Sequence, residues 1–214
     1  MLPKLVTEFI GTFFLVLTIG LTVLIGSDFA PVAIGSVLMA MIYMGGHVSG
    51  AHYNPAVTLA VWMRGKLPTG EIAPYMIAQV LGASLAAIAA DLIVGDVLRV
   101  QPAAETGLAS FFLLELLFTF ALALVILHVA TDPDTEGNSY YGIAIGFTVL
   151  AGAFAAGPIS GGAFNPAVAV GALIGDFIVG DGQTAKHLWV YLVATFSGGA
   201  LAALVYKMQT PESA

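Results

Sequence analysis

The stretch Gly45-Gly-His-Val-Ser-Gly-Ala-His-Tyr-Asn-Pro-Ala-Val57 decides how this 214-residue chain folds. Its last four residues are typical of a helix start, because Asn caps a first turn and Pro suits the first helical position. The apolar run that follows, 54–64, is about 11 residues long and would span roughly 16 Å as a helix, about half a membrane. The Gly- and Ser-rich residues before it cannot continue a helix. We therefore expect the chain to enter a membrane extended and to return as a half-helix.

A second copy of this pattern lies 111 residues further on, where Ala156-Gly-Pro-Ile-Ser-Gly-Gly-Ala-Phe164 precedes a half-helix predicted over 165–175. Glu8 likewise reappears 107 residues later as Glu115. The chain therefore divides into two halves, residues 1–106 and 107–214. With three spans in each half, equivalent segments cross in opposite directions, and such an inverted repeat predicts a site near the membrane midplane. The alternative is a pair of surface loops followed by capped amphipathic helices.

The composition is that of a membrane protein, since 59% of the residues are hydrophobic and only 9% are charged, against about 25% in soluble domains. A span needs roughly 20 apolar residues. Six stretches qualify: 5–26, 32–46, 71–95, 109–130, 139–157 and 187–206. The fold class predicted is an all-α membrane protein of six transmembrane helices and two re-entrant half-helices. No connecting segment is long enough for a second domain, so we expect one domain over 1–214.

Several function classes are disfavoured by the same composition. The net charge of −7 offers no basic patch for nucleic acid, and the absence of Cys excludes a disulfide scaffold. No cofactor loop, metal constellation or catalytic triad is recognisable, so neither an enzyme nor a cofactor is expected. The basic residues Lys4, Arg64, Lys66 and Lys207 favour both termini on the cytoplasmic side. The location expected is a bacterial or archaeal cell (inner) membrane.

The segment His47-Val-Ser-Gly-Ala-His-Tyr-Asn-Pro-Ala-Val57 and the second Asn165-Pro-Ala167 resemble the paired signature of the aquaporin, or major intrinsic protein, family. The resemblance extends over the whole chain and includes Glu8-Phe-Ile-Gly-Thr12, Gln79-Val-Leu-Gly-Ala83, Glu115 and Ser197-Gly-Gly-Ala200. It implies a homotetramer with a pore in each protomer. It also implies that the half-helices meet at their caps, formed by Asn54, Pro55, Ala56, Asn165, Pro166 and Ala167.

The physical chemistry of two opposed half-helices fits a pore. Each helix N-terminus contributes roughly half a positive charge at the midplane. Asn54 and Asn165 are expected to offer NH₂ donors to the lumen while their side-chain oxygens cap their own helices. Unpaired loop carbonyls would supply acceptors from Gly50, Ala51, His52, Tyr53, Gly161, Gly162 and Ala163. Cations and protons would meet a barrier, whereas water and small neutral solutes would pass.

The intramembrane acids Glu8 and Glu115 suggest a functional site and even a proton relay by default. The family resemblance instead implies that they hold the loop backbones by accepting N–H bonds. His47 is interpreted as a further loop anchor. A metal site at His47 and His52 is disfavoured because the motif contains no third ligand.

The selectivity filter is where the sequence departs from the family. The residue after the second Asn-Pro-Ala is Arg in most members and Val168 here, and the resemblance places the other filter positions at Ile34, Ala153 and Gly162. These residues offer no charged donor and little bulk, which predicts an unusually wide, apolar mouth. We therefore expect a passive channel for water and small uncharged solutes such as glycerol, urea, hydrogen peroxide or arsenite.

Two other classes stay open at this point. An ion-coupled secondary transporter can also have inverted repeats and broken helices, and Glu8 and Glu115 would be its coupling acids. A non-conducting structural membrane protein would keep the fold with a blocked pore.

Overall fold

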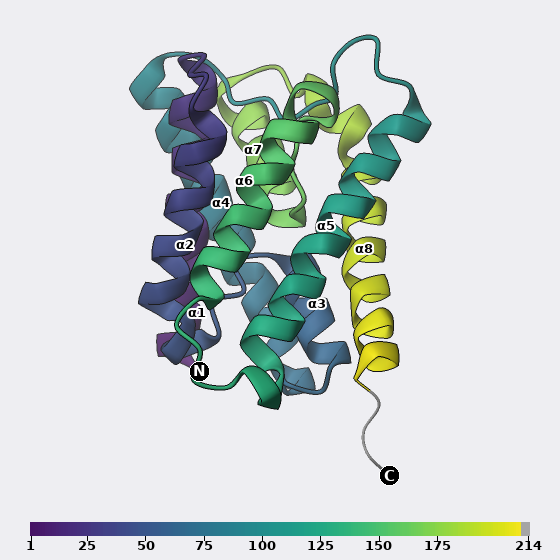
Figure 1. The fold of residues 1–214 in the computed structure, drawn as a ribbon. Coiled ribbons are helices and arrows are strands. Elements are labelled where there is room, and N and C mark those ends of the chain that lie inside the picture. Colours follow the sequence, from purple (N-terminus) through teal and green to yellow (C-terminus); the bar gives the residue numbers. More distant parts are fainter. Residues whose placement is uncertain (211–214) are drawn as a thin grey trace.

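The computed structural model describes residues 1–210. Its framework is a bundle of six helices, each long and apolar enough to cross a membrane (Figure 1). They are α1 (Leu2–Leu24), α2 (Ala30–Ser49), α4 (Ile72–Val94), α5 (Leu108–Thr131), α6 (Tyr141–Ser160) and α8 (Leu188–Gln209). Three short 3-10 turns join them: η1 (Thr69–Glu71), η2 (Pro133–Thr135) and η3 (Gln183–His187). The predicted all-α membrane fold is confirmed.

Two short helices lie inside this bundle, α3 (Pro55–Met63) and α7 (Pro166–Val179). Each begins at the predicted Pro, because the preceding asparagine caps its first turn. Asn54 Oδ1 accepts from the Ala56 N–H at 2.9 Å, and Asn165 Oδ1 accepts from the Ala167 N–H at 2.9 Å. Figure 1 shows α3 toward the end of the bundle where α1 starts and α8 ends, and α7 toward the opposite end.

The packing of the helices repeats between the two halves. Helix α1 packs against α2 and α4, as α5 packs against α6 and α8, and α2 and α6 contact each other. Each half-helix is held by the other half, since α7 lies against α4 and α3 lies against α8. Glycines permit these close approaches: a Cβ on Gly198 of α8 would come within 2.5 Å of the Leu116 carbonyl of α5. The small residues of α4 and α8 therefore set the distances at which the bundle packs.

Helices α2 and α6 are longer than predicted. They end at Ser49 and Ser160 rather than at 46 and 157, so Pro158 lies within the last turn of α6. Both helices stop at a glycine in the left-handed conformation, Gly50 with φ 87° and Gly161 with φ 89°. This C-cap conformation strongly favours glycine. The extended segments are consequently confined to 50–54 and 161–165.

A candidate pore between the two half-helices

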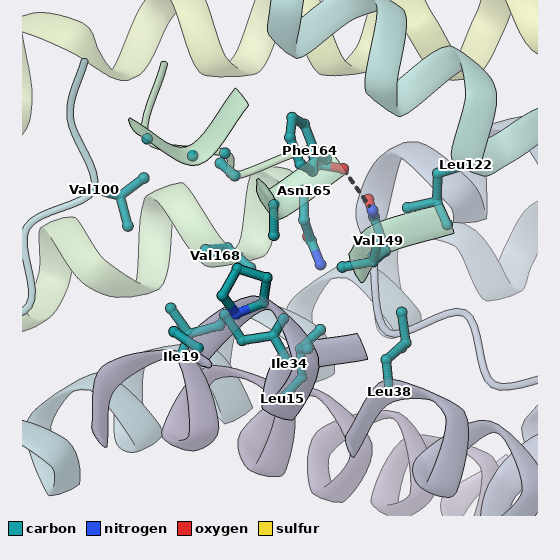
Figure 2. A pocket seen from close by; sticks show the side chains of 18 of the residues that line it. Leu15, Ile19, Ile34, Leu38, Val100, Leu122, Val149, Phe164, Asn165 and Val168 are labelled. Atoms are coloured by element: carbon teal, nitrogen blue, oxygen red, sulfur yellow. Dashed lines mark hydrogen bonds between the residues drawn. The ribbon is translucent and has the colours of Figure 1, made fainter. Parts of the chain in front are cut away.

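The two capping asparagines hold each other's loops at the centre of the bundle. Asn54 Nδ2 donates to the Phe164 carbonyl at 2.8 Å, the bond dashed in Figure 2, and Asn165 Nδ2 donates to the Tyr53 carbonyl at 2.9 Å. An amide NH₂ carries two hydrogens, so each asparagine keeps one donor beyond this bond. The Tyr53 carbonyl, expected to be unpaired, is therefore engaged by the opposite asparagine.

The carbonyls that accept these bonds are positioned by unusual backbone. Tyr53 and Phe164 have φ of 51° and 47°, in the left-handed region that costs a residue with a Cβ about 1–2 kcal/mol. The contacts of the Tyr53 side chain hold the first of these conformations. The Tyr53 ring lies over the bare faces of Gly11 and Gly45, and its hydroxyl donates to the Met41 carbonyl at 2.9 Å. Two of the three non-glycine residues with positive φ in the described residues are thus those whose carbonyls face the asparagines, and the third is Ala51 of the first loop.

Glu8 collects four donors around the first loop. Its fully buried carboxylate accepts from the backbone N–H groups of His52 (3.0 Å) and Tyr53 (2.7 Å). It also accepts from Ser49 Oγ at 2.6 Å and Gln79 Nε2 at 2.8 Å. A carboxylate has acceptor sites for all of them. The contacts of Glu8 therefore join α1, α2, α4 and the first extended segment.

Glu115 has the equivalent place in the second half, with three donors. It is fully buried and accepts from the backbone N–H groups of Ala163 (3.1 Å) and Phe164 (2.8 Å) and from Ser160 Oγ (2.7 Å). Thr195 of α8 lies three residues before Gly198, as Gln79 of α4 lies three residues before Gly82. It donates to the carbonyl of Tyr191 in its own helix at 2.6 Å and not to Glu115. The second loop is therefore anchored with one contact fewer than the first.

Two tyrosines, not predicted from the sequence, also hold the loops. The Tyr75 hydroxyl donates to the Ser49 carbonyl at 2.8 Å, and the Tyr191 hydroxyl donates to the Ser160 carbonyl at 2.5 Å. Each satisfies a carbonyl at the end of a transmembrane helix. The internal repeat could have predicted this pair of tyrosines. Each lies seven residues before a glycine that packs against the backbone of a neighbouring helix, Gly82 in α4 and Gly198 in α8.

Replacing Glu8 with Gln is expected to destabilise the protein by about 1–3 kcal/mol, because one carboxylate oxygen becomes an NH₂ that faces N–H donors. Glu115→Gln is expected to cost less, since it disturbs one donor fewer. Thermal unfolding in detergent measures the difference, and Glu105→Gln, on an exposed loop residue, is the matched control. A Glu8→Gln protein of wild-type stability that had lost gradient-driven flux would instead support the proton-relay interpretation.

A cavity of about 460 Å³ lies on the side of the asparagines toward the α4–α5 loop. All four predicted filter residues line it together with both asparagines: Ile34, Ala153, Gly162 and Val168. Figure 2 shows Val168 and Asn165 on one side of the cavity, with Ile34 and Leu38 across from them. Val168 is 2% exposed and its neighbours on the wall are mainly aliphatic. We call this space the outer cavity.

A second cavity of about 740 Å³, the inner cavity, lies on the side where the chain begins. Five residues line both cavities and so mark their junction: Ile42, Ala51, His52, Ile126 and Ile145. Asp132 lies at the inner mouth, where the Asp134 N–H and the Tyr206 hydroxyl hold the pKa of its carboxyl below the usual range. This carboxylate is charged at neutral pH.

The loop residues that carry free carbonyl groups line the two cavities. Within residues 1–210, six carbonyls of the extended segments accept no hydrogen bond: those of Gly50, Ala51, His52, Gly161, Gly162 and Ala163. Gly50 lines the inner cavity, the second-loop residues line the outer cavity, and Ala51 and His52 line both. The backbone therefore offers acceptors on either side of the asparagines.

His47 differs from its prediction. It was expected to anchor the first loop, but α2 continues to Ser49, so His47 is a helical residue. Its side chain is exposed, lines the inner cavity, and makes no hydrogen bond to another residue of the described part, 1–210. The residues that contact the loop from α2 and α4 are Ser49, Tyr75 and Gln79 instead.

Comparison with known proteins decides the family. The sequence model of the major intrinsic protein family matches residues 1–206. This chain belongs to the major intrinsic protein family. It is 38% identical to aquaporin NIP1-4 of Oryza sativa subsp. japonica over 217 residues, covering 97% of this chain and 77% of the relative. It is 34% identical to the probable aquaporin NIP-type of Nicotiana alata, over 97% of this chain and 77% of that relative.

The fold agrees with a solved member. The X-ray structure of the aquaglyceroporin from Plasmodium falciparum superposes with a TM-score of 0.84 at 22% identity, covering 96% of this chain and 95% of the other. As a major intrinsic protein, this chain is an integral membrane channel for water and small neutral solutes and not an enzyme. The two relatives compared by sequence are plant proteins, so they give no support to the expected bacterial or archaeal membrane.

Proposed function

We propose that water and small uncharged solutes pass through the outer and inner cavities in single file, with Asn54 and Asn165 as the central barrier to ions. The observation that carries this proposal is the reciprocal bond between each asparagine and the opposite loop. It fixes two half-helix N-termini at one point and leaves one amide hydrogen of each asparagine free to donate. A water passing there donates no hydrogen to either amide, and a cation meets the positive helix ends.

The selectivity filter proposed consists of Ile34, Ala153, Gly162 and Val168. Their common place on the outer cavity supports this assignment. Since none carries a charge or a side-chain donor, solutes would be sorted by size and by the cost of losing water. Glycerol, urea, hydrogen peroxide and uncharged arsenite are the solutes proposed, beside water. Glycerol facilitators resemble one another in having charged residues where this chain has Ala169 and Leu173, so we propose a broader neutral-solute pore and not a member of that subgroup.

The remaining proposals concern the buried glutamates, the domain organisation, the orientation in the membrane and the oligomeric state. Glu8 and Glu115 are proposed to support the loops, because their carboxylates contact loop N–H groups and are buried away from both cavities. We propose a single channel domain over 1–214, both termini on the cytoplasmic side, and a homotetramer in the lipid bilayer. No cofactor, metal or nucleic acid enters the proposed mechanism.

Stopped-flow light scattering on proteoliposomes tests the proposal. Vesicles containing the protein are expected to shrink faster than empty vesicles in sucrose, and to re-swell faster in glycerol or urea. The flux should rise linearly with the solute gradient and be unaffected by proton or sodium gradients. Saturable, gradient-coupled flux would favour the ion-coupled transporter, whereas no flux from folded protein would favour a structural role.

A further inference from the structure

The loop between α4 and α5 contributes a wall to the outer cavity. We infer that Val100 on this loop limits the size of solutes that reach Val168, and that Arg99 is the positioning residue that holds Val100 there. This inference rests on the proposed channel function and on Val168 as a filter residue. It adds a fifth position, on a loop between two membrane spans, to the four filter positions.

Val100 is buried although it lies on a connecting loop. Its side chain is 8% exposed and that of the neighbouring Leu98 is 1% exposed. Both pack in one apolar cluster with Val168 and Phe111, and Val100 and Val168 line the same cavity. Figure 2 shows Val100 reaching from the loop toward the space beside Val168. A change in the size of either side chain therefore changes the width of the same passage.

Arg99 ties this loop to the half-helix that carries Val168. Its Nε lies 3.3 Å from Asp176 Oδ1 on α7, and its Nη2 donates to Asp181 Oδ1 at 3.2 Å. The loop is also fixed on both sides of Arg99. The Leu98 N–H donates to Asp91 Oδ1 at 2.7 Å, and the Ala103 N–H donates to the carbonyl of Ile159 in α6 at 3.0 Å.

Arg99 also lines the outer cavity, but its guanidinium nitrogens Nε and Nη2 lie against these two carboxylates. Asp176 has no exposed side-chain surface. Its other donors are the N–H and hydroxyl of Thr184 in η3, at 3.2 and 2.9 Å, and the Asp181 N–H at 3.4 Å. An anion buried in this way is unfavourable without a cation beside it. Removing the guanidinium leaves Asp176 with neutral donors but without a cation. The short segment between the anchors at Leu98 and Ala103 would then shift, and Val100 would leave the mouth.

The first test varies the wall itself. We expect Val100→Ala to raise the ratio of glycerol to water permeability severalfold in proteoliposomes, and Val100→Phe to lower it severalfold. Water permeability should change less in both, because water is smaller than the passage in either. Glu105→Gln, at an exposed position of the same loop, is the matched control and should leave the ratio unchanged.

The second test asks whether Arg99 acts through Val100. Arg99→Met should raise the ratio as Val100→Ala does, and Arg99→Lys should restore much of the wild-type value by pairing with Asp176. In the Arg99→Met background, Val100→Phe should no longer lower the ratio. If the two effects instead add, Arg99 acts on the solute directly and the positioning role is wrong.

The outcomes separate this inference from the proposed function. A wild-type protein that conducts water and glycerol, with a ratio that neither Val100 variant changes, overturns the inference and leaves the channel proposal standing. A folded wild-type protein that conducts neither overturns the channel proposal itself. The Val100 variants change only apolar bulk and leave the Arg99–Asp176 pair intact. They therefore test the role of Val100 even if Arg99→Met fails to fold.

Discussion

Replacing both Asn54 and Asn165 with Asp is expected to give a channel that conducts monovalent cations. Each change adds a carboxylate at a half-helix N-terminus and removes the donor to the opposite loop. Two unit charges 4 Å apart interact by about 4 kcal/mol at an effective dielectric of 20. Since about 1.4 kcal/mol corresponds to tenfold, we expect cation conductance at least about tenfold above wild type in planar bilayers.

The control for this experiment places a negative charge elsewhere along the same path. Gln101 is exposed and lines the outer cavity, so Gln101→Glu adds a carboxylate at the mouth without touching the midplane. It should not produce a cation current. If the folded double Asp variant conducted no more than wild type, the ion barrier would lie elsewhere than at the asparagines.

Replacing Val168 with Arg is expected to convert a broad channel into one selective for water. The guanidinium would narrow the outer cavity and present up to five N–H donors, which water can use and larger solutes cannot reach. The free carbonyls of Gly161, Gly162 and Ala163 line the same cavity and can accept from it. We expect glycerol and urea permeability to fall by about tenfold or more while water permeability changes little.

The size of Arg and its charge can be separated. Val168→Leu adds bulk without a charge and should reduce glycerol flux only in part. Because Val168 and Val100 belong to one apolar cluster and line the same cavity, the double variant Val168→Arg, Val100→Ala gives the new side chain room. Unchanged glycerol flux in a folded Val168→Arg protein would remove Val168 from the filter, whereas equal loss of water and glycerol flux would indicate a plugged pore.

Local patterns in the sequence were enough to predict most of the fold. Asn followed by Pro fixed the start of α3 and α7, since cap and first-turn chemistry depend on adjacent residues. The ends of α2 and α6 were predicted three residues early, because the Gly- and Ser-rich segments before the two Asn-Pro-Ala motifs were expected not to continue a helix. The structure ends both helices at the next glycine that adopts a left-handed conformation.

The contacts within the site were harder to predict, because they join residues distant in sequence. The placement of Glu8 and Glu115 near the loops followed from the internal repeat, and their supporting role stays a prediction. The pairing of Asn54 with the Phe164 carbonyl could not be derived, since it depends on a backbone conformation with positive φ. The Arg99–Asp176 pair could not be predicted from the internal repeat or from helix periodicity, because it joins a loop of the first half to the half-helix of the second.

The reciprocal asparagine bonds also bear on how the chain is made. The bond from Asn54 joins residues 110 positions apart, and that from Asn165 joins residues 112 apart. At a synthesis rate of about 5–20 residues per second, Asn54 is made roughly 5–20 s before its acceptor. During this interval the first re-entrant loop is in the membrane without its partner. Completion of the first half thus waits for translation of the second, so a chain truncated before Phe164 is expected to be a substrate for membrane quality-control proteases.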